Sequence, residues 1–194
     1  MNAPPAVTDL PAAQRHRFIA DGFTNVVVAV SDWDAPTPVA EWTARDVVAH
    51  LVEWFPGFLA GGGITLPPTP HPADRPVAAW RAHAAAVQDL LDGPSARQTF
   101  SHPMVGRFPL ADAIDTFYTA DVFMHTWDLA TAVGITPDLD ARFAEHLLDG
   151  MVGMEDILRS SGQYGPAVPV DPDADPVTRL VGFIGRDPQW RRGT

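Results

Sequence analysis

The sequence predicts an all-α protein whose helices form a bundle. Several long segments place apolar residues at three- and four-residue spacing, which is the period of an amphipathic helix. Strand signals are few, and no internal repeat or convincing domain linker interrupts the chain. The length of 194 residues and the apolar fraction of 46% suit one folded domain of ordinary size. We therefore predict a single helical domain over residues 1–194.

The first predicted helix spans residues 10–30. Its apolar residues recur at helical spacing: Phe18, Ile19, Phe23, Val26, Val27 and Val30. The valine-rich end, residues 26–30, is also compatible with a strand, because short β-branched runs fit both structures. Residues 31–41 are rich in Asp and Pro and are predicted to form a loop.

The second predicted helix begins at Thr43. This residue is a typical N-cap, and Asp46 follows at the spacing of a capping box. Pro56 is expected to kink or end this helix. Residues 61–76, which hold three consecutive glycines and several prolines, form a long connection that is either functional or mobile. An alanine-rich third helix is predicted over residues 77–91.

The second half of the chain contains the longest predicted helices. Residues 98–108 are irregular, and a short hairpin around Gly106 is one interpretation of them. Further on, the pattern predicts a fourth helix over 110–133, a fifth over 137–160, an irregular Pro/Asp-rich stretch over 162–176 and a short last helix over 177–184.

The composition excludes several classes of function. The chain contains no cysteine, so disulfides, thiolate metal sites and a cysteine nucleophile are excluded. The net charge is −11, which argues against nucleic acid and against anionic membrane surfaces as partners. The N-terminus lacks the pattern of a signal peptide, and no apolar run is long enough to span a bilayer. We therefore expect a cytoplasmic protein.

The segment from Asp121 to Asp128 has the strongest chemical pattern. Asp121 and His125 are four residues apart, so they share one helix face, and Asp128 lies one turn further along it. An ordinary Asp–His contact on an exposed face would also explain the pair. However, apolar neighbours predict a helix that is buried on more than one side, where polar groups need partners. A metal ion is one such partner.

His50 is the third candidate ligand. It lies in an apolar part of the second helix, where a hydrogen-bonded core histidine is the simpler interpretation. Together, His50, Asp121 and His125 would form a three-ligand site in the bundle core. Three protein ligands leave coordination positions open, as in catalytic metal sites. The other histidines have weaker patterns, and His146 is the best reserve ligand. The six tryptophans fit core or rim positions, and no phosphate-binding loop, His-Glu-x-x-His or nucleophile-elbow motif occurs.

Three motifs together resemble a known family. The segment Trp42-Thr43-Ala44-Arg45-Asp46-Val47-Val48-Ala49-His50-Leu51, the segment His125-Thr126-Trp127-Asp128-Leu129 and the ending Phe183-Ile184-Gly185-Arg186-Asp187-Pro188-Gln189-Trp190 occur in the family's order. They are similar to actinobacterial proteins related to the N-terminal domain of mycothiol-dependent maleylpyruvate isomerase, in the DinB-like superfamily. The resemblance implies an up-down-down-up four-helix bundle and a metal bound by the residues at His50, Asp121 and His125.

The resemblance also has limits. The isomerase has Glu where this chain has Asp121, which is one methylene shorter and alters metal distance and preference. The isomerase also has a second, C-terminal domain for which this chain is too short, so its substrate residues cannot be transferred.

Three functions are compatible with these observations. The first is a transferase or isomerase in which the metal activates the thiol of mycothiol for attack on an electrophilic substrate. Asp128 would then orient a ligand histidine, and Trp54 and Trp127 would line the pocket. The second is a metal-dependent hydrolase, and the third is a non-enzymatic binding or sensing module. Zinc or nickel is the expected metal, with iron or manganese as alternatives. Surplus apolar residues on the fourth and fifth predicted helices are compatible with a homodimer.

Overall fold

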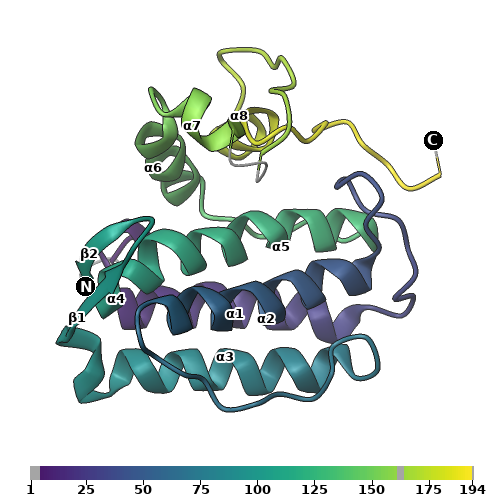
Figure 1. Ribbon diagram of the computed structural model, residues 1–194. Helices are drawn as coiled ribbons and strands as arrows, with labels where there is room; N and C mark the ends of the chain where they lie inside the picture. The colour runs from purple at the N-terminus through teal and green to yellow at the C-terminus, as the bar shows by residue number, and fades with distance from the viewer. Residues whose placement is uncertain (1–4, 161–163, 194) are drawn as a thin grey trace.

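Long helices that pack side by side make up most of the molecule (Figure 1). The computed structural model describes residues 5–160 and 164–193. Within these ranges the chain is mainly helical, as predicted. The long helical segments are α1 (Ala12–Ala29), α2 (Ala44–Gly61), α3 (Pro76–Asp92) and the run of α4 (Leu110–Ala113), η3 (Ile114–Thr119) and α5 (Ala120–Ala132). Both α1 and α2 pack against α3 and against α5, so these helices close a ring around a common apolar core.

Local sequence explains where the first helices begin. The Thr43 side chain accepts a hydrogen bond from the Asp46 backbone, and Asp46 bonds back to the Thr43 backbone, which completes the predicted capping box of α2. The valine-rich end of α1 is helical as far as Ala29, so the strand interpretation is wrong. Pro56 was expected to kink or end α2, and of these two alternatives the end is wrong, because the helix continues to Gly61. Burial of Phe55 and Leu59 explains this, since packing of one helix face outweighs one lost hydrogen bond.

The fourth predicted helix is one uninterrupted helical run, but its middle part is not an α-helix. Residues 110–132 are helical, but η3 within them is a π-helix with one extra residue per turn. Just before this run, β1 (Thr99–His102) pairs antiparallel with β2 (Gly106–Pro109). The turn between these strands needs Gly106, whose φ is +91°. The short hairpin considered from the sequence is therefore present.

The C-terminal part adds shorter helices beside α5 (Figure 1). These are α6 (Ala141–Met151), α7 (Glu155–Ser160) and α8 (Pro176–Phe183), and α6 packs against α8. The prediction of one helix over 137–160 is wrong, because the chain turns between α6 and α7 at Gly153, where φ is +88°. Of the irregular stretch predicted over 162–176, residues 162 and 163 lie outside the described ranges.

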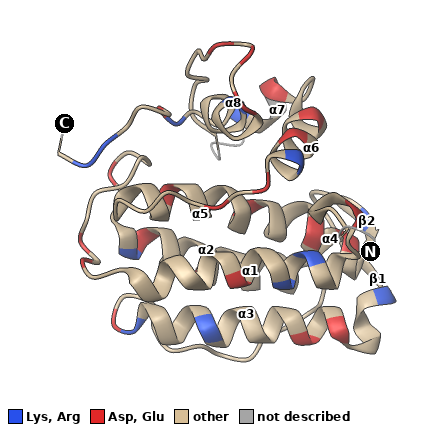
Figure 2. Ribbon diagram, turned by 180° about the vertical axis from the view of Figure 1, so that it is seen from behind, with Lys and Arg blue, Asp and Glu red and all other residues tan. Residues whose placement is uncertain are grey.

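The charged residues are spread over the molecule. Figure 2 shows Asp and Glu in red on most helices and loops, with arginines in blue among them. In the described part of the chain, no helix combines the length and the apolar character that a membrane crossing requires.

Candidate metal centre

Two facing helices bring the three predicted ligands together. His50 lies on α2, and Asp121 and His125 lie one turn apart on α5, which packs against α2. One potential ligand atom from each residue lies within 4.8 Å of the others. The spacing in the sequence placed Asp121 and His125 on one face, and the packing of α2 on α5 supplies His50.

The carboxylate of Asp121 is the centre of this cluster. Its Oδ2 lies 3.2 Å from His50 Nε2, and its Oδ1 lies 3.5 Å from His125 Nε2. The indole Nε1 of Trp54 donates to Asp121 Oδ2 at 3.0 Å. The two imidazole rings are 4.9 Å apart between centroids. Both Nε2 atoms and the carboxylate therefore converge on one point.

This donor set fits a divalent metal ion. Ligand atoms of a tetrahedral zinc site stand about 3.4 Å apart, given metal–ligand distances of about 2.1 Å. The two Asp121–imidazole distances, 3.2 and 3.5 Å, are close to that spacing. Two imidazoles and one carboxylate suit zinc, nickel, iron and manganese.

Asp128 occupies the position expected of a residue that orients a ligand. It is fully buried, and its Oδ2 accepts a hydrogen bond from His125 Nδ1 at 2.9 Å. This bond turns the other ring nitrogen, Nε2, toward Asp121. Arg186, from the segment after α8, donates to both oxygens of the same carboxylate at 3.2 Å.

Burial and charge set the protonation of the cluster. Burial opposes the charged form of Asp121, but the imidazoles of His125 and His50 outweigh it and lower the pKa of this carboxyl group. Burial also opposes the charged form of His125, yet the Asp121 and Asp128 carboxylates raise the pKa of the ring. Burial likewise opposes the charged form of Asp128, but its hydrogen bond with His125 and the charge of Arg186 lower the pKa of this carboxyl group, so both carboxylates are ionised. Burial, together with the Asp121 charge, raises the pKa of Tyr164 to about 12, so this neighbour stays neutral.

Aromatic rings line the cluster. Trp54 contacts Asp121, and its ring stacks on His50 at 6.1 Å. Trp42 lies beside both histidines, with its ring 5.0 Å from His50 and 5.7 Å from His125. Trp127 is buried, and none of the ring pairs among the described residues includes it, so its place in the pocket stays a prediction.

Access to the cluster lies on the side of His50. Its side chain is 31% exposed, compared with 19% for Asp121 and 6% for His125. A ligand that reaches the cluster from solvent therefore meets His50 first, beside the half-buried rings of Trp42 and Trp54. His146, the reserve ligand, is on α6 and stacks on Phe143, apart from the cluster.

The site also contains two residues that were not predicted for it, Trp42 and Arg186. Both lie in the motifs that carry the family resemblance, Trp42 in residues 42–51 and Arg186 in residues 183–190, and this was the signal that could have found them. Trp42 comes directly before the helix cap Thr43, and its ring lies beside His50 on α2. No local periodicity indicates the contact of Arg186 with α5.

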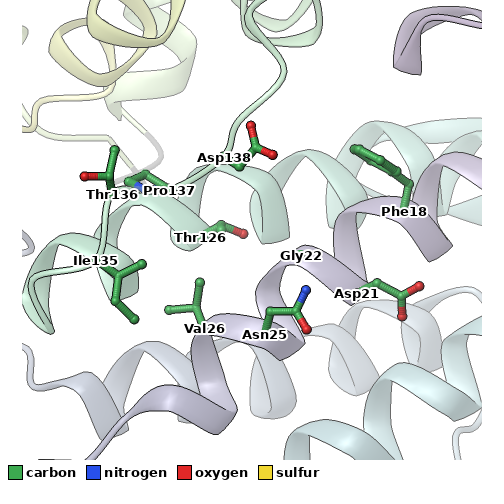
Figure 3. A pocket seen from close by; sticks show the side chains of 10 residues that line it. All are labelled: Phe18, Asp21, Gly22, Asn25, Val26, Thr126, Ile135, Thr136, Pro137 and Asp138. Carbon is green, nitrogen blue, oxygen red and sulfur yellow. The ribbon is translucent and has the colours of Figure 1, made fainter.

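A separate hollow lies between α1 and the segment after α5 (Figure 3). Its volume is about 400 Å³, and neither His50, Asp121 nor His125 lines it. Its walls are Phe18, Asp21, Gly22, Asn25, Val26, Thr126, Ile135, Thr136, Pro137 and Asp138.

Known proteins identify the family. Residues 16–62, which contain most of α1, all of α2 and His50, match the family described as the mycothiol maleylpyruvate isomerase N-terminal domain. Over 180 residues the chain is 31% identical to an uncharacterised protein of Mycobacterium tuberculosis, found in strains CDC 1551 / Oshkosh and H37Rv. The alignment covers 88% of this chain and 95% of that relative. The chain belongs to the mycothiol maleylpyruvate isomerase N-terminal domain family. No solved structure matches it significantly.

The family match covers only part of the cluster. His50 lies inside the matched residues, whereas Asp121, His125 and Asp128 lie beyond them. The evidence that α5 contributes ligands is therefore the geometry of this structure, in which Asp121 and His125 lie close to His50.

Proposed function

We propose that this protein binds one divalent metal ion and is a thiol-dependent transferase or isomerase whose co-substrate is a thiol of the mycothiol type. The observation that carries this proposal is the convergence of His50 Nε2, Asp121 and His125 Nε2 on one accessible point. Membership of a family named for a mycothiol-dependent isomerase supports the choice of thiol. The absence of cysteine means that the reactive sulfur comes from outside the chain.

Different residues of the chain would have different roles in this reaction. A divalent ion lowers the pKa of a thiol that binds to it, which supplies a nucleophile near neutral pH. His50, Asp121 and His125 would hold the ion, and Asp128 would keep the His125 ring turned toward it. Trp42 and Trp54 would exclude water and pack against the apolar part of the electrophile.

The proposed reaction balances without an oxidant. The thiol sulfur forms a bond to an electrophilic carbon, and the thiol proton passes to solvent. In a transferase the leaving group departs with its bonding electron pair. In an isomerase the sulfur adds to an unsaturated carbon and is later expelled, so the thiol is regenerated.

Several further features belong to the same proposal. Zinc or nickel is the first choice of metal, and iron or manganese the second. We place the helices in the DinB-like class with up-down-down-up order, as one domain over residues 1–194 that acts in the cytoplasm and pairs as a homodimer. Its partners would be small molecules rather than nucleic acid or membrane, in keeping with the net charge of −11.

The test measures metal content and thiol chemistry on the same sample. Protein purified without a histidine tag is analysed for metal by mass spectrometry and then assayed with mycothiol and 1-chloro-2,4-dinitrobenzene. We expect about one equivalent of metal and a conjugation rate above the uncatalysed one. A chelator should abolish this rate, and zinc or nickel should restore it.

Other outcomes would favour the alternatives. Chelator-sensitive hydrolysis of ester or amide substrates in the absence of thiol would replace the proposal with a metal-dependent hydrolase. Metal binding with no turnover of any electrophile would indicate a binding or sensing module. Protein that stays free of metal when zinc, nickel or manganese is offered would overturn the proposal.

A further inference from the structure

An arginine from the far end of the chain contacts the candidate metal centre through Asp128. Arg186 is 58 residues from Asp128 in sequence, and its Nε and Nη2 donate to the two carboxylate oxygens at 3.2 Å each. The Asp128 side chain is fully buried and that of Arg186 is 11% exposed. In Figure 1 the yellow segment that holds this arginine leaves α8 and runs above α5.

The guanidinium is held in place from its own side as well. The turn after α8 depends on Gly185, whose φ is +86° and whose position leaves no room for a Cβ beside the Pro166 carbonyl. The Arg186 backbone N–H donates to the Val181 carbonyl at 3.0 Å, and its Nη1 donates to the Ile184 carbonyl at 3.0 Å. A planar group fixed in this way presents a rigid fork to a carboxylate.

The contact continues from Asp128 to a candidate ligand. Asp128 Oδ2 accepts from Arg186 and also from His125 Nδ1, at 3.2 and 2.9 Å. A carboxylate held in this way keeps the proton of a neutral imidazole on Nδ1. The lone pair of Nε2 is then free to coordinate a metal ion.

We propose that Arg186 is a positioning residue for the metal centre, because it fixes Asp128 and thereby the tautomer and orientation of His125. This inference rests on the proposed metal-binding function and extends it, since the C-terminal helices become part of the site. A merely structural ion pair would contribute to the free energy of unfolding but would leave the His125 tautomer and the metal affinity unchanged.

A matched pair of arginine variants tests the inference. Arg186→Met removes the fork beside Asp128. Arg179→Met is the control, because Arg179 lies on α8, pairs with Glu145 at 2.7 Å and does not touch the centre. In a competition titration of zinc against a chromophoric chelator, we expect Arg186→Met to bind zinc about 10- to 100-fold more weakly than the wild type. Arg179→Met should stay within about twofold of the wild type.

A second measurement needs no metal. Long-range ¹H–¹⁵N NMR on the metal-free protein, at a pH where the ring is neutral, reports which nitrogen of His125 holds the proton. We expect the Nδ1–H form in the wild type and in Arg179→Met, and a mixture of both forms in Arg186→Met. Arg186→Lys keeps the charge without the fork, so its fraction of the Nδ1–H form should lie between those of the wild type and Arg186→Met. This variant also tests the inference if Arg186→Met does not fold.

The outcomes separate this inference from the proposed function. Wild-type protein that binds no zinc overturns the proposed function, while the NMR measurement still decides the role of Arg186. If Arg186→Met or Arg186→Lys folds with an unchanged His125 tautomer and unchanged zinc affinity, Arg186 is a structural residue only and the inference is wrong.

Discussion

Two pairs of histidines lie in the same ring of helices in opposite surroundings. His50 and His125, on α2 and α5, face the carboxylate of Asp121. His16 and His83, on α1 and α3, are each only 1% exposed. Their packing neighbours are aromatic, with the Tyr118 ring 6.1 Å from His16 and 5.4 Å from His83.

The pairs also differ in how their polar atoms are satisfied. Among the described residues, both ring nitrogens of His83 and Nε2 of His16 have no hydrogen-bond partner. Burial, and then the nearby His16, lowers the pKa of His83 to about 4. Burial likewise lowers the pKa of His16, although Gln88 opposes this. By contrast, the carboxylates around His125 raise its pKa despite burial.

The difference shows what makes a buried histidine a candidate ligand. Burial alone gives a neutral ring that packs among other aromatic rings and has no charge beside it to attract a cation. A buried carboxylate beside the ring gives the charge that a cation needs and fixes the position of the donor nitrogen. Variants that change one pair and leave the other intact should therefore have different effects on metal binding and on stability.

The largest expected difference is in metal affinity. His50→Ala and His125→Ala each remove one of three donor atoms and should weaken zinc binding by about 1,000-fold or more, well beyond the loss of a supporting residue. His83→Leu removes a buried imidazole from the other pair and should stay within about twofold of the wild type. Equilibrium competition titrations on folded variants check this. A similar loss in His83→Leu would mean that the two pairs are not independent.

The next effect is the dependence of stability on pH. The pKa of His83 is about 4 in the folded protein and about 6.5 in the unfolded chain, so between these values only the unfolded state takes up the proton. The free energy of unfolding should therefore fall by about 3 kcal/mol from this residue as the pH drops from 6.5 to 4. Urea titrations across this range should show a smaller fall for His83→Leu. His71→Ala, in an exposed loop, should retain the slope of the wild type. If the free energy of unfolding of His83→Leu falls with pH as steeply as that of the wild type, His83 is not the source of this pH dependence.

The smallest effect concerns two aromatic residues whose rings are 6.1 Å apart. Trp54→Phe removes the hydrogen bond to Asp121 and should lower the free energy of unfolding by about 1–2 kcal/mol. Tyr118→Phe removes a buried hydroxyl that has no partner among the described residues, so it should change stability by less than about 0.5 kcal/mol.

Denaturant unfolding at neutral pH measures both changes. Trp42→Phe serves as the volume control, because it makes the same truncation beside His50 without removing an indole hydrogen bond to Asp121. A loss in Trp42→Phe as large as that in Trp54→Phe would attribute the effect to packing rather than to the hydrogen bond.

The sequence by itself determined the local structure. Helical spacing of apolar residues predicted α1 and the run over residues 110–132, alanine-rich composition predicted α3, and the Thr43–Asp46 pattern predicted the start of α2. It also placed Asp121, His125 and Asp128 on one helix face, because residues three and four apart are neighbours on a helix. These features depend on interactions within a few residues, which is why periodicity reveals them.

The tertiary structure decided the rest. The extension of α2 past Pro56, the break at Gly153 and the π-helix before Asp121 depend on how whole helices pack, and propensity is too weak to fix them. The sequence favoured His50 over His83, but only packing shows that His50 faces a carboxylate whereas His83 faces aromatic rings. Packing likewise brings Trp42 beside His125 and Arg186 to Asp128, because contacts between distant segments leave no periodic signal in the chain.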